Sequence, residues 1–165
     1  AGGEYLVFCD ADTVIPHADE FFKKALGIFA AHPRLAGLTV SIRVLPEYET
    51  RGDKIVFTLL NTFNTFMNNV LHAGRAAGEF QMVRRAAFQA LGGYRSDLVA
   101  SEDYEFFSRL SRIGETRMEK GLTIFHTGRR AHKIGWPRLL TIWFLNTISV
   151  IFRKRAASKE WEEIR

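Results

Sequence analysis

The sequence predicts an α/β domain, because short apolar runs typical of strands alternate along the chain with segments of helical periodicity. The chain has 165 residues, of which 47% are apolar and 13% aromatic, which is enough for one domain with its own core. Glycine and proline show no fixed period, which excludes collagen-like and linker-like chains. We therefore expect the order strand–helix–strand–helix–strand–helix–strand.

The first half of the chain opens with a strand at 5–9, where a continuous apolar run ends at two acids. Such a run is typical of a buried strand in a parallel sheet. A helical pattern follows, which Pro16 and Asp19 open and Pro33 ends. Apolar and polar residues then alternate over 38–44, which indicates a strand with one buried face.

The remaining elements continue the alternation. We expect a long amphipathic helix at 54–72, a strand at 80–83, a helical turn at 85–91, a helix at 102–113 and a strand at 118–125. The apolar residues that make the long helix amphipathic, spaced by three and four, are Val56, Leu59, Leu60, Phe63, Phe66, Met67 and Val70.

The positive charge lies in the C-terminal part of the chain. Residues 126–165 hold nine Lys or Arg against three Glu, whereas residues 1–125 hold fourteen against fifteen acids. This asymmetry favours an anionic surface as a partner of the tail and argues against a nucleic-acid-binding protein. A single cysteine, Cys9, excludes an internal disulfide and a cysteine-based zinc site, and its apolar surroundings predict a buried thiol.

The tail has a distinct composition. Leu139 to Phe152 is fourteen residues without a charge, flanked by Arg138 and by the basic run 153–155. A helix of this length spans roughly 21 Å, which is shorter than the hydrocarbon core of about 30 Å. Two interpretations stay open: an amphipathic helix in a membrane interface and an ordinary buried C-terminal helix.

Asp10 and Asp12 are the first candidate functional residues. They directly follow the predicted strand at 5–9, at the edge where open α/β sheets place their ligands. A divalent cation held by one or two carboxylates can bridge a diphosphate. We therefore favour a metal or phosphate role over a solvated turn.

Glu102 and Asp103 stand at a predicted helix start, with Ser101 as its N-cap. Acids in a first helical turn are also favourable to the helix dipole, so their position alone decides nothing. They follow a glycine pair, Gly92 and Gly93, which allows a loop to approach a ligand closely, and this makes them a candidate general base.

A third group ends the last predicted strand. His126 is a possible metal ligand, although a lone histidine is more often structural. Arg129 and Arg130 suit a diphosphate through bidentate hydrogen bonds, or they form a solvated charge pair.

Three motifs in order resemble family 2 glycosyltransferases of the GT-A fold. They are D-A-D after an apolar strand, R-R-x-x-F-x-x-x-G-G-Y over Arg84–Tyr94, and S-E-D at a helix start. The later R-R pair, Gly135-Trp136 and an apolar helix containing Asn146 are similar to membrane-associated members. The resemblance covers nearly the whole chain and implies a partial GT-A mixed sheet flanked by helices, with a C-terminal amphipathic or interfacial helix.

The resemblance also implies roles for the matching residues. Asp12, assisted by Asp10, would bind Mg²⁺ or Mn²⁺ on the diphosphate of a nucleotide-sugar donor, and Asp103 would deprotonate the acceptor hydroxyl, with Glu102 beside it. The sugar would then move in a single inverting displacement. The remaining implied residues are Gly92, Gly93 and Tyr94 on the acceptor side, and His126, Arg129 and Arg130 near the metal and diphosphate.

The chain departs from the family in two ways. In the family, the D-x-D motif follows a strand about halfway through the catalytic domain. In this sequence the corresponding strand, at 5–9, lies near the first residue. The nucleotide-recognising half therefore lies outside this chain, or the reading frame is truncated. The tail motif Q-x-x-R-W is absent, and 130–136 is only distantly similar, which favours single-sugar transfer. We expect 1–135 to be the C-terminal part of a catalytic domain and 136–165 an apolar and basic tail helix, for which membrane contact and burial both stay open.

The expected acceptor is a saccharide or a lipid-linked sugar, and the expected location is the cytoplasmic face of a membrane. Two other functions stay open. One is metal-dependent nucleotidyl or phosphoryl transfer, which also uses paired acids around a diphosphate. The other is an inactive membrane-docking remnant, which would bind lipid without binding nucleotide.

Overall fold

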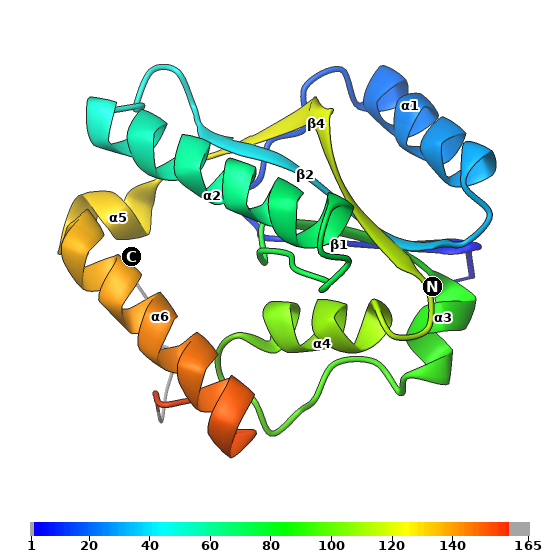
Figure 1. Ribbon diagram of the computed structural model, residues 1–165. Coiled ribbons are helices and arrows are strands. Elements are labelled where there is room, and N and C mark those ends of the chain that lie inside the picture. Colours follow the sequence, from blue (N-terminus) through cyan, green and yellow to red (C-terminus); the bar gives the residue numbers. More distant parts are fainter. Residues whose placement is uncertain (1, 159–165) are drawn as a thin grey trace.

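The computed structural model describes residues 2–158, and these contain a four-stranded mixed sheet in the order β1-β3-β2-β4 (Figure 1). The strands are β1 (Tyr5–Cys9), β2 (Leu35–Val44), β3 (Phe80–Arg84) and β4 (Glu115–His126). β3 pairs antiparallel with both β1 and β2, whereas β2 and β4 are parallel. The predicted α/β class and the positions of all four strands are confirmed.

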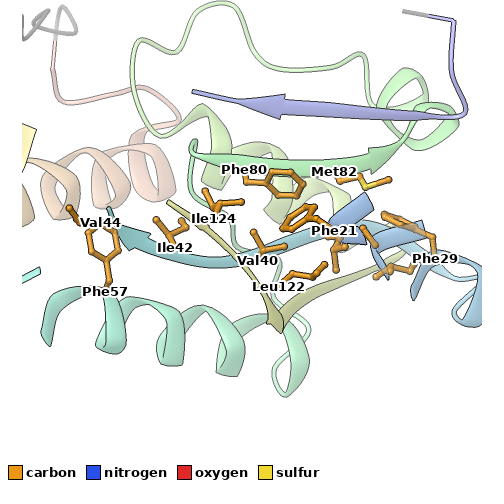
Figure 2. Close-up of a cluster of buried hydrophobic side chains, with 13 residues drawn as sticks. Phe21, Phe29, Val40, Ile42, Val44, Phe57, Phe80, Met82, Leu122 and Ile124 are labelled. Carbon is orange, nitrogen blue, oxygen red and sulfur yellow. The ribbon is translucent and has the colours of Figure 1, made fainter. Parts of the chain in front are cut away.

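Helices flank this sheet, and the structure divides the apolar side chains into two clusters. The first joins α1 and Phe57 of α2 to the sheet, and Figure 2 shows its side chains between helix and strands. The second joins α4 to Val83 of β3, with residues of β1 and α3 at its margin. The helices are α1 (Ala18–Ala31), α2 (Arg51–Asn69), α3 (Arg85–Ala90), α4 (Glu102–Leu110), α5 (Arg129–Ile134) and α6 (Trp136–Arg153).

β1 lies in a different environment from the predicted one. Among the described residues it pairs with β3 alone, in the antiparallel sense, rather than inside a parallel sheet. Its side chains are therefore only partly covered, and Cys9, which we expected to be buried, is exposed. The apolar run predicted the strand but not its neighbours, because strand pairing depends on contacts far apart in the chain.

β2 is more buried than its alternating sequence predicted. The strand extends over ten residues, and both of its faces are covered for most of its length. Thr39, expected on an exposed face, is buried and donates a hydrogen bond of 3.0 Å from Oγ1 to the backbone oxygen of Phe80. A polar side chain is tolerated there because it satisfies a backbone acceptor.

α2 turns much of its apolar side outward, and two of its amide side chains bond the backbone of neighbouring strands. Asn61 bonds both the N–H and the carbonyl of Ile42, at 3.2 and 3.0 Å, and Asn69 bonds the same two groups of Met118, both at 2.9 Å. These amide side chains provide hydrogen bonds to the strand backbone that a neighbouring strand would otherwise provide. Of the predicted apolar side, Leu59, Phe63, Phe66 and Val70 are exposed, and Val56, Leu60 and Met67 are half-buried.

α6 is amphipathic, and contact of its exposed side with a membrane stays a prediction. Its buried side consists of Leu139, Asn146, Ser149 and Val150, while Phe144 and several other apolar residues are exposed. Among residues 2–158, no helix has the length and apolarity that crossing a bilayer requires.

Candidate active site

Four acids come from three places in the chain to one end of the sheet. Asp10 and Asp12 directly follow β1, Glu79 directly precedes β3, and Asp103 lies in the first turn of α4. β1 and β3 are antiparallel, with Cys9 paired to Phe80, so the end of β1 lies beside the start of β3. The sheet register therefore brings the first three acids together, and α4 adds the fourth.

Gly78 marks the point where Asp10 and Asp103 approach each other. A Cβ atom on this glycine would lie 3.8 Å from Asp10 Oδ1 and 4.0 Å from Asp103 Oδ2. The backbone of Gly78 is not in the left-handed region, so its torsion angles do not demand glycine. What the absent side chain provides is space beside both carboxylates.

Burial and mutual repulsion raise the pKa values of three of these acids. Burial raises the pKa of Asp103 to about 7, and the charge of Glu102 acts in the same direction. A hydrogen bond of 2.7 Å from the backbone N–H of Tyr104 to Asp103 Oδ1 opposes the shift, as does the charge of Arg75.

The other two acids respond to the same surroundings. Burial also raises the pKa of Glu79 to about 7, with Asp10, Asp103 and Asp12 adding to it. The pKa of Asp10 is raised by burial and by the charges of Asp12 and Glu102. Carboxylates gathered in this way are stabilised by a bound cation or a proton.

Arg75 provides a positive charge beside the acids. Its guanidinium lies over the ring of Phe63 at 5.0 Å and over the ring of Tyr104 at 5.1 Å. Burial lowers its pKa, and the charge of Asp103 opposes that shift. Asn68 fixes the backbone at this position by bonding the N–H and the carbonyl of Arg75, at 3.0 and 2.6 Å.

The segment after β4 reaches the acids through Thr127, which donates a hydrogen bond of 2.6 Å from Oγ1 to Asp12 Oδ2. The charge of Arg130 lowers the pKa of Asp10, so this arginine faces the cluster, while Arg129 is exposed. Of the predicted diphosphate ligands, Arg130 is therefore the one placed toward the acids.

His126 is buried beside the acids without direct contact with them. Its Nδ1 accepts a hydrogen bond of 3.3 Å from the Gly128 N–H, and its buried Nε2 has no hydrogen-bond partner among the described residues. Burial lowers its pKa, and the charges of Asp12 and Asp53 oppose that shift. With Nδ1 as acceptor, the neutral ring carries its proton on Nε2, which is not the tautomer that ligates a metal through Nε2.

The predicted acceptor-side residues have structural contacts of their own. Tyr94 donates a hydrogen bond of 2.6 Å to Gln81 Oε1, and burial followed by the charges of Asp103 and Glu102 raises its pKa. Gly92 and Gly93 both have positive φ angles, and a Cβ on Gly93 would lie 2.9 Å from the ring of Phe88. The glycine pair thus allows a tight turn beside the site.

Ser101 directly precedes α4, as predicted, but its side chain does not cap the helix. Its backbone is left-handed, with φ of 60°, a conformation that costs free energy in a residue other than glycine. The turn at Ser101 sets where Glu102 and Asp103 enter the site.

A second polar cluster fastens α5 and α6 to the start of α2. Asp53 is fully buried and accepts hydrogen bonds from Thr50 N and Oγ1 (both 2.7 Å), His132 Nε2 (2.8 Å) and Trp136 Nε1 (2.8 Å). Burial by itself raises the pKa of Asp53, but the bonds from His132, Thr50 and Trp136 outweigh it and bring the pKa below its ordinary value. This contact holds the helix that begins with Arg129 and Arg130.

Sequence reasoning did not find Glu79, Gly78, Arg75 or Asp53. Glu79 had a usable signal, because it is an acid immediately before a predicted strand. If that strand pairs antiparallel with the one at 5–9, its start must lie beside Asp10. Nothing in the local sequence of Asp53 indicates that its partners lie in α5 and α6.

The donors at the site fit a divalent ion that arrives with a diphosphate. Among residues 2–158, no three His, Cys, Asp or Glu side chains are gathered so that they alone would hold a metal. Carboxylate oxygens are nevertheless the ligands that Mg²⁺ and Mn²⁺ prefer, and one or two of them suffice when phosphate oxygens and water complete the shell. Asp10 and Asp12 meet that requirement.

No protein-family model matches the sequence, and no curated protein sequence matches it. Among solved structures, the chain is similar to the mannosyltransferase PcManGT from Pyrobaculum calidifontis in complex with GDP-Man and Mn²⁺. The two superpose with a TM-score of 0.63 and 20% sequence identity, over 93% of this chain. The chain therefore shares the mixed α/β fold of this glycosyltransferase.

This likeness establishes the fold class and confirms the predicted α/β arrangement. The match extends over 39% of the mannosyltransferase chain, so the chain described here spans well under half of that protein's length. The fold places Asp10 and Asp12 at the end of a strand, where nucleotide-binding α/β proteins hold their ligands.

Proposed function

We propose that the chain is part of a family 2 glycosyltransferase that moves a sugar from a nucleotide-sugar donor to an acceptor hydroxyl with inversion. The observation that carries this proposal is the approach of Asp10 and Asp103 to each other at Gly78, within a glycosyltransferase fold. One carboxylate suits the donor diphosphate, and the other suits the acceptor. Carboxylates from two separate segments at one point of the fold suit a reaction that holds two substrates side by side.

Asp12 and Asp10 are the residues that would hold a divalent ion, Mg²⁺ or Mn²⁺, on the donor diphosphate. The ion would neutralise charge on the leaving nucleoside diphosphate. The hydrogen bond from Thr127 orients Asp12, so that its other oxygen is left for a ligand. Arg130, whose charge reaches Asp10, would contact the same diphosphate.

Asp103 is proposed as the general base. A base with a pKa of about 7 is deprotonated in a large fraction of molecules at neutral pH and still accepts a proton effectively. Burial is the main reason for this raised pKa, and the charges of Glu102 and Arg75 adjust it in opposite directions. The Asp103 carboxylate would take the proton of the acceptor hydroxyl while the oxygen of that hydroxyl attacks the sugar.

The donor and the location are also part of the proposal. The mannosyltransferase similar to this chain was solved with GDP-Man and Mn²⁺, which supports a nucleotide-sugar donor and makes GDP the first nucleotide to test. The acceptor would be a saccharide or a lipid-linked sugar. The basic tail supports a position at the cytoplasmic face of a membrane.

The decisive experiment is a calorimetric titration of the chain with GDP and UDP, in the presence and absence of Mn²⁺. We expect Mn²⁺-dependent binding of one nucleotide that Asp12→Ala abolishes. Asp19→Ala, an exposed acid of α1, is the matched control and should bind like the wild type. Binding by the Asp12→Ala variant, or none by a folded wild-type chain, would contradict the proposed diphosphate site.

A further inference from the structure

α2 exposes the apolar side that its sequence would be expected to bury. At about 3.6 residues per turn, Gly52, Leu59, Phe63, Phe66 and Val70 fall on one stripe of the helix. The last four are 65, 45, 48 and 59% exposed. The opposite side is held to the sheet by asparagine side chains, so the outward position of the stripe is fixed by specific hydrogen bonds.

α6 carries a second apolar stripe of the same kind. Leu140, Phe144 and Ile151 share the side of the helix on which Trp136 stands. They are 36, 64 and 38% exposed. Two further apolar residues of the helix, Leu145 and Phe152, are also exposed.

Trp136 joins the two stripes. A Cβ atom on Gly52 would lie 3.3 Å from Trp136 Cδ1, so the indole covers the N-terminal end of the α2 stripe. The indole N–H bonds Asp53, and the ring lies 5.4 Å from that of Phe57, which fixes its position. α2 and α6 diverge from this point (Figure 1), so their stripes form two arms that meet at Trp136.

We name this region the Trp136 surface: Leu59, Phe63, Phe66 and Val70 on α2, and Leu140, Phe144 and Ile151 on α6, with Trp136 between them. Large apolar side chains exposed together along two helices of a folded chain are typical of an interaction site. Its α2 arm reaches the candidate active site, because the ring of Phe63 lies under the guanidinium of Arg75, which faces Asp103.

The charges around the surface indicate the partner. Residues 136–158 contain Arg138, Arg153, Lys154 and Arg155 and no acid, and all four basic residues are exposed. Basic side chains at the ends of an amphipathic helix with exposed aromatic residues are typical of helices in a membrane interface. Each basic residue near an anionic bilayer strengthens binding by about fivefold.

We propose that the Trp136 surface docks the chain on an anionic lipid bilayer, with α2 and α6 both in contact with the lipid. The contribution of α2 distinguishes this arrangement from attachment through the tail helix alone. The proposal does not depend on sugar transfer, because it concerns a surface and not the acids. A chain that binds no nucleotide could therefore still bind vesicles, and a chain that binds no vesicles could still bind nucleotide.

The test is co-sedimentation of the chain with vesicles of equal parts phosphatidylglycerol and phosphatidylcholine, compared with vesicles of phosphatidylcholine alone. We expect binding to the anionic vesicles that weakens as salt is raised. The informative variants are Leu59→Gln and Phe66→Gln on α2, and Phe144→Gln on α6. Each should weaken binding roughly tenfold, because it removes a large apolar side chain from the lipid contact.

Leu26→Gln on α1 is the matched control, since Leu26 is an exposed leucine on a helix outside the surface. It should leave vesicle binding unchanged. All substituted residues are exposed, so circular dichroism and the melting temperature should stay those of the wild type. Loss of binding through Phe144→Gln alone, with both α2 variants unaffected, would overturn the proposal.

Two other results would also overturn it. Equal binding to both kinds of vesicle would remove the role of the basic residues. A wild-type dimer that Phe66→Gln converts to a monomer, with no vesicle binding by either, would show that a second copy of the chain covers the surface.

Discussion

Asp10 and Asp103 approach the same glycine, although one follows the first strand and the other opens a helix far along the chain. A methyl group on Gly78 would lie 3.8 Å from Asp10 Oδ1 and 4.0 Å from Asp103 Oδ2. These distances are ordinary van der Waals contacts, so the space beside the two carboxylates is just large enough for a methyl group. Gly78 is therefore a sensitive probe of whether a ligand occupies that space.

Gly78→Ala should leave the fold intact and weaken nucleotide binding. The backbone there does not require glycine, and the added methyl would meet no backbone atom within 4 Å among the three nearest neighbours. It would, however, displace water or ligand between the acids, with a loss of affinity on the order of tenfold or more. Calorimetric titration with GDP and Mn²⁺ measures this effect, and Gly27→Ala, where a Cβ meets nothing within 4 Å, is the control. Unchanged affinity in Gly78→Ala would place the ligand elsewhere.

The stability of the chain should fall as pH rises from about 4 to about 7. The pKa values of Asp103 and Glu79 are about 7 in the folded chain, against about 4 in an unfolded one. The folded state therefore binds more protons in this window, and its advantage disappears as the protons leave. Melting temperatures at both ends of the window measure the fall.

Asp103→Asn should make that fall smaller, because it removes one of the two groups that bind a proton in the folded chain within this window. Asp97→Asn is the control, because Asp97 is paired with Arg95 and its pKa is lowered, so it does not contribute to the fall. Asp103→Asn should also bind nucleotide normally and abolish sugar transfer if Asp103 is the general base. An equal fall in wild type and Asp103→Asn would show that Asp103 does not titrate near neutral pH.

Asp53→Ala should destabilise the chain by about 1–3 kcal/mol, because it removes the buried acceptor shared by the donors of Thr50, His132 and Trp136. Trp136→Phe keeps an aromatic ring and removes one donor, so it should cost about 1 kcal/mol. Denaturant unfolding measures both values. If Asp53→Ala cost no more than Trp136→Phe, the cluster would not act as a unit in fastening α5 and α6.

Asn69→Leu should also be destabilising, although it replaces a polar residue of a helix with an apolar one. Asn69 satisfies the backbone N–H and carbonyl of Met118, and a leucine would leave both without partners, at a cost of about 1–3 kcal/mol. Thr62→Leu, on the exposed side of the same helix, is the matched control and should change stability by less than about 0.5 kcal/mol. A neutral Asn69→Leu variant would mean that water replaces the lost bonds.

The local sequence was sufficient for the elements themselves. Apolar runs and helical periodicity predicted all four strands and the long helices, and the two acids after the first strand were found as a candidate site. The convergence of Asp10 with Glu79 and Asp103 was not predicted, because it depends on the antiparallel pairing of β1 with β3 and on the position of α4. The order of the motifs, through the family resemblance, assigned Asp10 and Asp103 to one site. The structure showed that both carboxylates lie beside Gly78.

α2 is the clearest example of a feature that the sequence alone does not determine. Its residues determined that a helix forms and which side chains share a face, because periodicity is a property of the chain itself. Which face turns inward was decided by the tertiary structure, where Asn61 and Asn69 of α2 bond the backbone groups of Ile42 and Met118. A buried backbone group without a hydrogen bond costs more than exposed apolar area, and this need exists only once the sheet has formed.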